Sequence, residues 1–288
     1  MYVPHFEYLR PVTLDAALAT LAERGAGVRP LAGGTDLLLS MKEGKSRPQA
    51  LLSLQDIPEL HTITFSDGRV QVGAAVTIGE LTGEDLVKEN AALGDLRRVF
   101  ASAPIRNLAT VGGNICNAAA CADSPPILLV NDAELTIAGA GRQRSVSLAE
   151  FITGPRATAL AADELLVSLT FGARNPGSAY IKFGSRQAVN IAIVGVACAL
   201  ELTGSVVSRA VVAVTAASPK PLLYDAESAR GAKPSRELWD SIAADVAERL
   251  APISDLRGSA DYRLQLARVG TVRGFERSLE RLEGLSHA

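Results

Sequence analysis

The sequence contains little cysteine and little histidine, three of each in 288 residues. The cysteines are Cys116, Cys121 and Cys198. An odd, small number of thiols gives no disulfide framework and suits a reducing compartment. An ordinary iron–sulfur cluster needs four cysteine ligands, so the chain cannot supply a full set. His5, His61 and His287 have no acidic or thiol partner at ligand spacing. We therefore expect neither a metal site nor a histidine-based catalytic dyad.

A strong excess of charge of either sign is also missing. Lysine and arginine number 29, aspartate and glutamate 31, and no basic tract stands out. Nucleic-acid binding is therefore not expected as the main role. The most apolar stretches, residues 191–202 and 206–217, are too short and too interrupted to cross a bilayer as helices. The first residues show no leader pattern and no twin arginine, so the expected location is the cytoplasm.

The first half of the chain has the pattern of an α/β protein. Leu14, Leu18 and Leu21 recur at helical spacing, with Thr13 as the expected N-cap and Gly25 as the stop. The expected strands are residues 6–9, 28–32, 51–54, 69–72 and 134–138. Further helices are expected from the capping-box pair Thr77 and Glu80, over residues 93–100, and over residues 127–130.

The pattern changes after residue 165. Strands are expected over residues 165–171, 179–183, 195–203 and 206–215, and two amphipathic helical stripes follow, Leu238 to Leu250 and Tyr262 to Leu282. The Arg174-Asn175-Pro176-Gly177 turn is the expected boundary between domains of residues 1–175 and 176–288. The second domain is expected to be a short antiparallel sheet packed with helices.

Two glycine pairs are the main candidates for a binding site. Gly33-Gly34 precedes Thr35 at the end of an expected strand, and Gly112-Gly113 follows Thr110 closely. Glycine permits positive φ and lets backbone N–H groups approach an anion, forming a small nest for phosphate. Either pair alone is also an ordinary turn, but the two together predict a site for one pyrophosphate. The Rossmann fingerprint Gly-x-Gly-x-x-Gly is absent, which disfavours a nicotinamide dehydrogenase of that type.

A family resemblance begins at these residues and covers essentially the whole chain. The chain resembles the FAD-binding medium subunits of the molybdenum hydroxylases, which include xanthine dehydrogenase and carbon monoxide dehydrogenase. The motifs, in order, are Ala32-Gly33-Gly34-Thr35-Asp36, Ile105-Arg106-Asn107-x-x-Thr110-Val111-Gly112-Gly113-Asn114, Asp123-x-Pro125-Pro126, Glu164-Leu165-Leu166, Tyr180-x-Lys182-Phe183 and Ser259-Ala260-x-Tyr262-Arg263. The implied first domain is a two-part FAD-binding domain of the vanillyl-alcohol-oxidase-like type.

The resemblance also implies which residues contact FAD. Residues 31–37 would wrap the pyrophosphate, residues 110–114 would form a second loop, Asp123 would bond a ribose hydroxyl, and Lys182 would lie near the isoalloxazine. The full implied set is Leu31, Ala32, Gly33, Gly34, Thr35, Asp36, Leu37, Phe100, Ile105, Arg106, Thr110, Val111, Gly112, Gly113, Asn114, Asp123, Leu166 and Lys182. From pattern alone Phe100 and Leu166 would be core residues. Arg106 either binds the cofactor phosphates or forms a surface ion pair.

The implied role is electron transfer in a complex. A small subunit would hold [2Fe-2S] clusters, a large molybdopterin subunit would hold the molybdenum cofactor, and FAD here would pass electrons to NAD⁺, oxygen or a quinone. A dimer of heterotrimers is the expected assembly. Two alternatives are a free-standing FAD-dependent oxidase and a cofactor-free scaffold subunit. The short second domain leaves little room for the substrate pocket of an oxidase.

Overall fold

A computed structural model describes residues 3–186 and 189–286, so His287 lies outside the described residues. The chain begins with a small parallel sheet in the order β1-β3-β2, packed against α1. Thr13 accepts a hydrogen bond from the Ala16 N–H, and Gly25 ends α1 with a φ of 55°, as the sequence predicts. These elements are β1 (Glu7–Leu9), α1 (Leu14–Arg24), β2 (Val28–Leu31), α2 (Leu37–Lys42) and β3 (Ala50–Ser53).

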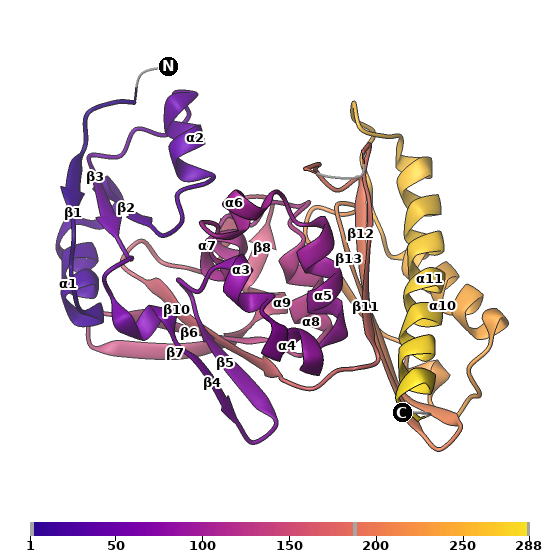
Figure 1. The fold of residues 1–288 in the computed structure, drawn as a ribbon. Coiled ribbons are helices and arrows are strands. Elements are labelled where there is room, and N and C mark those ends of the chain that lie inside the picture. Colours follow the sequence, from indigo (N-terminus) through magenta and orange to yellow (C-terminus); the bar gives the residue numbers. More distant parts are fainter. Residues whose placement is uncertain (1–2, 187–188, 287–288) are drawn as a thin grey trace.

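A five-stranded antiparallel sheet, in the order β4-β5-β10-β6-β7, forms the second part of the first domain. Short helices pack on this sheet and share a hydrophobic core with it (Figure 1). The strands are β4 (Ile63–Ser66), β5 (Arg69–Gly73), β6 (Glu134–Gly139), β7 (Arg142–Ser147) and β10 (Leu165–Gly172). The helices are α3 (Ile78–Leu81), α4 (Glu84–Glu89), α5 (Ala91–Val99), α6 (Ala103–Arg106), α7 (Val111–Cys116), α8 (Ser124–Val130) and α9 (Leu148–Phe151). A two-stranded hairpin follows, β8 (Ile152–Gly154) and β9 (Ala157–Thr158).

The last part is a four-stranded antiparallel sheet in the order β11-β12-β13-β14, covered by two helices. The elements are β11 (Ser178–Phe183), β12 (Val194–Thr203), β13 (Val206–Thr215), β14 (Leu222–Asp225), α10 (Arg236–Glu248) and α11 (Ala260–Ser286). Trp239 of α10 stacks on Phe275 of α11 with ring centroids 4.8 Å apart. Short 3-10 helices lie at Gly25–Gly27, Pro58–His61 and Glu227–Ala229.

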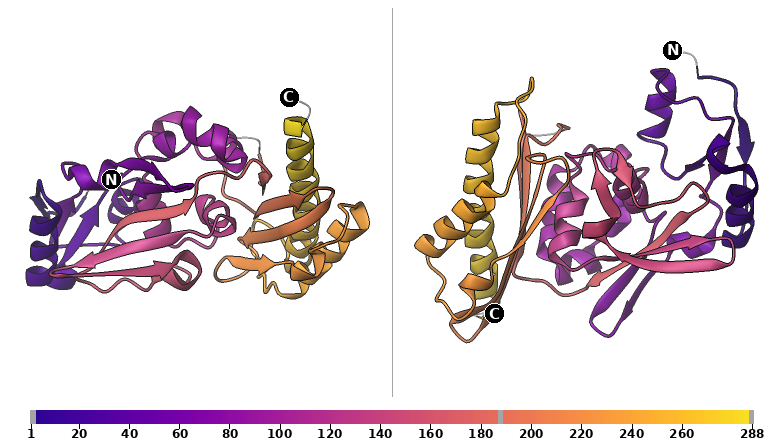
Figure 2. Two further views of the ribbon diagram at one scale, coloured as in Figure 1. Left: turned by 90° about the horizontal axis from the view of Figure 1, so that it is seen from below. Right: turned by 180° about the vertical axis from the view of Figure 1, so that it is seen from behind.

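Both faces of the last sheet are buried. Ala197 and Ala213 belong to the core shared with α5 and α8 of the first domain. Val196 and Cys198, which alternate with them along the strand, pack in a separate core with α10 and α11. Figure 2 shows the three parts in a row, with the sheet between the central helices and α11. Burial on both faces explains why β12 and β13 read as almost continuous apolar runs.

A buried carboxylate joins the first domain to the last helix. Asp95 on α5 accepts bonds from Arg281 of α11 at 2.8 and 2.9 Å and from the backbone N–H of Tyr180 at 2.9 Å. The Asp95 side chain is 5% exposed, so this is a shielded ion pair. α11 is thereby fixed to both its own sheet and the neighbouring domain.

The mixed α/β class and the final antiparallel sheet with helices are confirmed. The predicted boundary turn lies in the connection between β10 and β11. The strands β4, β7, β8, β9 and β14 were not predicted. β7 has Val146 as its single apolar residue, and the other four strands are only two to four residues long. The expected glycine turn at residues 110–114 is wrong, because these residues begin helix α7. Among the described residues, none of the helices combines the length and apolar character that a membrane span requires.

Candidate functional site

The first glycine segment leaves β2 and leads into α2 as an open loop. Gly34 has a φ of 70°, a conformation that glycine adopts without steric cost. The backbone N–H groups of Gly33, Gly34, Thr35 and Asp36 donate to no other described residue. These residues are half-buried or exposed. A row of unused N–H donors around a left-handed glycine is the arrangement that binds phosphate oxygens.

The second glycine segment has a different conformation from the one expected. Thr110 is the N-cap of α7, and its hydroxyl accepts the Gly113 N–H at 3.0 Å. The Gly112 N–H donates to the Ala74 carbonyl at 2.9 Å, and the Asn114 N–H donates to Thr110. Neither glycine has a positive φ. The N–H groups of this segment are therefore used within the chain, unlike those of the first loop.

The first loop nevertheless contacts the chain just before the second segment, at Leu108 and Ala109. A Cβ atom on Gly33 would lie 1.8 Å from the Leu108 carbonyl oxygen, just before Thr110. A Cβ on Gly112 would lie 2.6 Å from the Ala74 carbonyl oxygen. Both glycines are therefore required by close backbone packing. Gly112 fixes the second segment beside the end of β5, and Gly33 places the first loop against the residues just before that segment.

Arg106, at the end of α6, is bonded within the chain. Its Nη1 donates to the Phe100 carbonyl at 2.9 Å and to the Ala101 carbonyl at 3.4 Å. Ala101 has a φ of 38°, so the guanidinium stabilises an unfavourable turn after α5. The surface ion pair considered for Arg106 is absent from the described residues. Phe100 is buried, whereas Ile105 is exposed.

Asp123 and Lys182 form a buried ion pair between the two domains. Lys182 Nζ donates to Asp123 Oδ2 at 2.7 Å, and also to the carbonyls of Asn190 at 3.0 Å and Val99 at 3.3 Å. The Tyr180 hydroxyl donates to Asp123 Oδ1 at 2.7 Å. The Lys182 side chain is 3% exposed, so its donors are taken up within the protein. Burial raises the pKa of the Asp123 carboxyl, and the bonds from Lys182 and Tyr180 oppose that rise.

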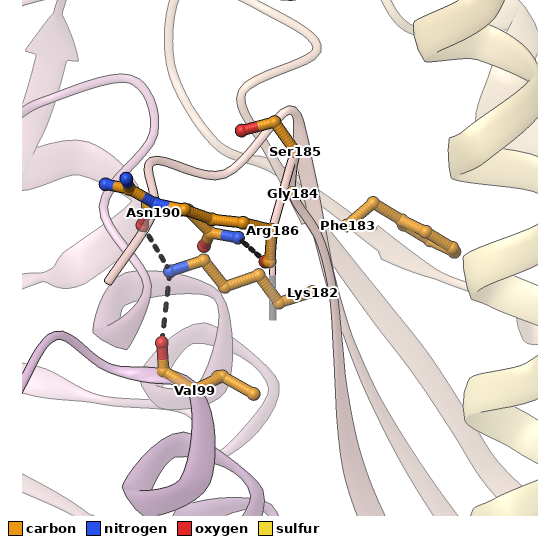
Figure 3. A pocket seen from close by; sticks show the side chains of 7 residues that line it. All are labelled: Val99, Lys182, Phe183, Gly184, Ser185, Arg186 and Asn190. Atoms are coloured by element: carbon orange, nitrogen blue, oxygen red, sulfur yellow. Dashed lines mark hydrogen bonds between the residues drawn. The ribbon is translucent and has the colours of Figure 1, made fainter. Parts of the chain in front are cut away.

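Lys182 lies at the wall of a polar cavity of about 340 Å³. Figure 3 shows its amine directed at the Val99 and Asn190 carbonyls, whereas Phe183 points away toward α11. The lining residues are Val99, Lys182, Phe183, Gly184, Ser185, Arg186 and Asn190. This hollow adjoins the Asp123 ion pair through Lys182.

The remaining predicted residues lie around the two segments or in the core behind them. The Leu31 side chain packs against Gly34, and Leu37 is the first residue of α2. Val111 is buried in α7, which contacts β10. Leu166, on β10, is buried and pairs with Ile137 in the sheet. The core position that pattern alone gives Leu166 is therefore observed.

Comparison with known families identifies both halves of the chain. Residues 4–171 match the model described as FAD binding domain in molybdopterin dehydrogenase. Residues 179–278 match the CO dehydrogenase flavoprotein C-terminal domain. The chain belongs to the FAD-binding subunits of the molybdenum hydroxylases.

Relatives of this family match along nearly their full length. The xanthine dehydrogenase FAD-binding subunit of Escherichia coli O157:H7 is 32% identical over 92% of each chain. The glyceraldehyde dehydrogenase medium chain of Sulfolobus acidocaldarius is 30% identical, covering 96% of this chain and 99% of that one. A solved carbon monoxide dehydrogenase from Hydrogenophaga pseudoflava matches with a TM-score of 0.92 at 28% identity, covering 98% and 99% of the two chains.

The residues present fit an FAD-binding subunit. The first loop offers unused N–H donors, and its Gly33 can occupy its place only because it has no Cβ. By contrast, burial raises the pKa of the Cys116 thiol to about 12, which disfavours the thiolate that binds metals. No group of His, Cys, Asp and Glu side chains suited to a metal ion occurs in the described part of this molybdenum hydroxylase subunit.

Two polar residues at the site were not singled out from the sequence. Tyr180 bonds Asp123, although its motif position was noted only as part of the resemblance. Arg156 lies in the β8–β9 hairpin, and its guanidinium reaches Asn117 and approaches Asp36. The dipeptide Pro155-Arg156 carries a turn signal, but no sequence pattern shows which loop the hairpin contacts.

Proposed function

We propose that this chain relays electrons through FAD from the [2Fe-2S] clusters of a small partner subunit to NAD⁺, oxygen or a quinone. Hydroxylation would occur on the molybdenum cofactor of a large partner subunit. FAD supplies the ability to accept electrons singly and release them in pairs. The observation that supports this role is the match of both halves of the chain to flavoprotein models of this enzyme family.

The first loop is the proposed diphosphate site. The N–H groups of Gly33, Gly34, Thr35 and Asp36 are unused by described residues, and they would bind the phosphate oxygens. Residues 110–114 would shape this site indirectly, because they begin α7 and so fix the Leu108–Ala109 backbone on which Gly33 packs. The exposed Ile105 would supply an apolar contact to FAD. The buried residues Phe100, Val111 and Leu166 would form the core behind the site.

Asp123 and Lys182 are proposed to position the site at the domain junction. Both Asp123 oxygens already accept bonds, from Tyr180 and Lys182, so a ribose hydroxyl would have to share an oxygen with one of them. Lys182 in turn holds the Val99 and Asn190 carbonyls beside the cavity. Arg106 would act through the Phe100–Ala101 turn that it stabilises.

The proposed partners are a large molybdopterin subunit and a small iron–sulfur subunit, in a dimer of heterotrimers. Relatives from Hydrogenophaga pseudoflava and Afipia carboxidovorans are named medium chains of carbon monoxide dehydrogenase. The nicotine 6-hydroxylase relative of Paenarthrobacter nicotinovorans is likewise named a medium subunit. We also propose residues 1–175 and 176–288 as the two domains.

The test measures how fast the reduced complex passes its electrons to an added acceptor. The chain is coexpressed with its two partners, the complex is reduced with dithionite, and the excess reductant is removed. The complex is then mixed with NAD⁺, oxygenated buffer or a soluble quinone, and reoxidation of the clusters is followed by absorbance. We expect rapid reoxidation by at least one acceptor, with flavin bound to this chain.

The matched variants are Gly33→Ala and Gly154→Ala. A Cβ at Gly33 would collide with the Leu108 carbonyl oxygen at 1.8 Å, whereas one at Gly154 would make an ordinary contact at 4.0 Å. Gly33→Ala is expected to lose most of the flavin and the rapid reoxidation, and Gly154→Ala to keep both. Equal reoxidation by a flavin-free complex would contradict the electron-transfer role. Full flavin content in Gly33→Ala would contradict the first loop as the diphosphate site.

A further inference from the structure

Arg156 occupies a turn position that normally suits glycine. It lies between β8 and β9 with a φ of 60°. The other tight hairpins place glycine at positive φ: Gly68 between β4 and β5, where Asp67 also has a positive φ, Gly141 between β6 and β7, and Gly204 between β12 and β13. An arginine in this conformation is unfavourable, since its Cβ meets the backbone. Backbone geometry therefore does not account for the arginine.

The Arg156 guanidinium lies between the first loop of the candidate site and the C-terminal end of α7. Its Nη1 donates to the Asn117 side chain, at the C-terminal end of α7. The same atom is 3.9 Å from Asp36 Oδ1 in the first loop. The Arg156 N–H anchors the hairpin by donating to the Ala118 carbonyl at 2.8 Å. The hairpin thus carries one cationic side chain to the gap between the first loop and the end of α7.

Much of this guanidinium remains available to a ligand. The Arg156 side chain is 63% exposed, and its pairing with Asp36 is long. Guanidinium offers five N–H donors, of which only one has a described acceptor here. The other two cationic side chains considered for the site already bond groups within the protein. Arg106 bonds two backbone carbonyls, and Lys182 is buried against Asp123.

We propose that Arg156 binds the diphosphate of FAD, in addition to the N–H groups of the first loop. Those N–H groups carry only partial charges, so a full positive charge is the missing complement to a diphosphate. The ligand would replace Asp36 as the nearest anion to the guanidinium. This inference rests on the proposed diphosphate site, and it adds a residue that determines affinity for phosphorylated flavin.

The test uses the full chain stripped of flavin, with the variants Arg156→Gly, Arg156→Lys and Arg142→Ala. Glycine at position 156 keeps the turn and removes the charge. Arg142 is the matched control, because it is a similarly exposed hairpin arginine whose side chain pairs with Asp163 and Glu164. Dissociation constants are measured for FAD, for ADP as a diphosphate without flavin, and for riboflavin as a flavin without phosphate.

Arg156→Gly is expected to raise the dissociation constants for FAD and ADP about tenfold, which is the effect of losing one charge-assisted hydrogen bond. Riboflavin affinity should be unchanged, and the salt dependence of FAD binding should become shallower. Arg156→Lys should recover part of the loss, and Arg142→Ala should bind as the wild type. The flavin-free Arg156→Gly chain should melt no lower than the wild type, because glycine relieves the positive φ.

Two results would overturn the inference while leaving the proposed function intact. One is wild-type affinity of Arg156→Gly for FAD and ADP. The other is an equal loss of FAD and riboflavin affinity together with a lower melting temperature, which would mean that Arg156 only stabilises the hairpin. If the wild-type chain binds neither FAD nor ADP, both the diphosphate site and the role of Arg156 are overturned.

Discussion

Single residues at the site act mainly through close packing and through hydrogen bonds to other residues of the chain. Gly33 and Gly112 were expected to supply positive φ, yet each is needed because another backbone segment passes within contact distance. Such a contact joins residues distant in sequence, so no local pattern reveals it. Asp123 and Lys182 were found through their motifs, but their mutual ion pair depends on how two domains meet.

Glu164 provides a residue-scale prediction for pH dependence. Arg144 donates to both of its oxygens, at 3.0 and 2.7 Å, and lowers the pKa of Glu164 to about 2. The stabilisation is therefore fully present above the ordinary pKa of about 4.5 and is lost as pH falls toward 2. The melting temperature of Glu164→Gln should lie below that of the wild type at pH 6, and the gap should narrow between pH 4.5 and 2. A gap independent of pH would show that the carboxylate charge is not responsible.

At the scale of elements, the sequence predicted what is encoded locally. The Thr13 cap and the reciprocal Thr77 and Glu80 bonds were read from the sequence and are observed, because each involves residues within one helical turn. Helix α7 was missed because Gly112-Gly113 has low helix propensity. The Thr110 cap and the packing of Gly112 on Ala74 outweigh that preference.

α11 supplies an element-scale prediction, because two of its glycines allow it to lie close to β12. A Cβ on Gly274 would be 2.5 Å from Cys198 Sγ, and one on Gly270 would be 2.7 Å from Val196 Cγ2. Gly274→Ala should reduce the free energy of unfolding by about 1–3 kcal/mol through overpacking. Chemical denaturation measures this change.

The control for that prediction lies in the same helix. A Cβ on Gly284 would meet nothing within 4 Å. Gly284→Ala should leave stability unchanged or raise it by up to about 1 kcal/mol, from helix propensity. Adding Cys198→Ala should lessen the cost of Gly274→Ala, since it removes the colliding sulfur. Equal losses with and without Cys198 would mean that the glycine acts in some other way.

For the whole molecule, the decisive feature is that the first domain buries one face of the last sheet and the helices α10 and α11 bury the other. The sequence predicted three of its four strands, β12 and β13 most clearly because they are rich in valine and alanine, but it missed the edge strand β14. Long apolar runs indicate burial on both faces but do not identify what covers each face. The contacts of the sheet with α5 and α8 could therefore not be predicted from the sequence and are seen only in the structure.

The Asp95 ion pair is expected to hold the two domains together. Asp95→Asn should reduce the free energy of unfolding by about 3 kcal/mol or more, since it leaves the Arg281 charge without its partner. Amide hydrogen exchange of α11 should accelerate in this variant. Asp240→Asn is the control, because its pair with Arg236 is exposed and worth less than about 1 kcal/mol. Unchanged exchange in α11 would show that the apolar sheet faces alone fix the domains.

The double-sided sheet limits how this chain can be divided. A fragment ending at residue 175 would leave α5 and α8 without the Ala197 and Ala213 face that covers them. The remaining fragment would present that same alanine face to water, so each half alone would tend to aggregate. Chimaeras that exchange halves between relatives would therefore need matched surfaces at this sheet, and the two halves are expected to be inherited as a unit.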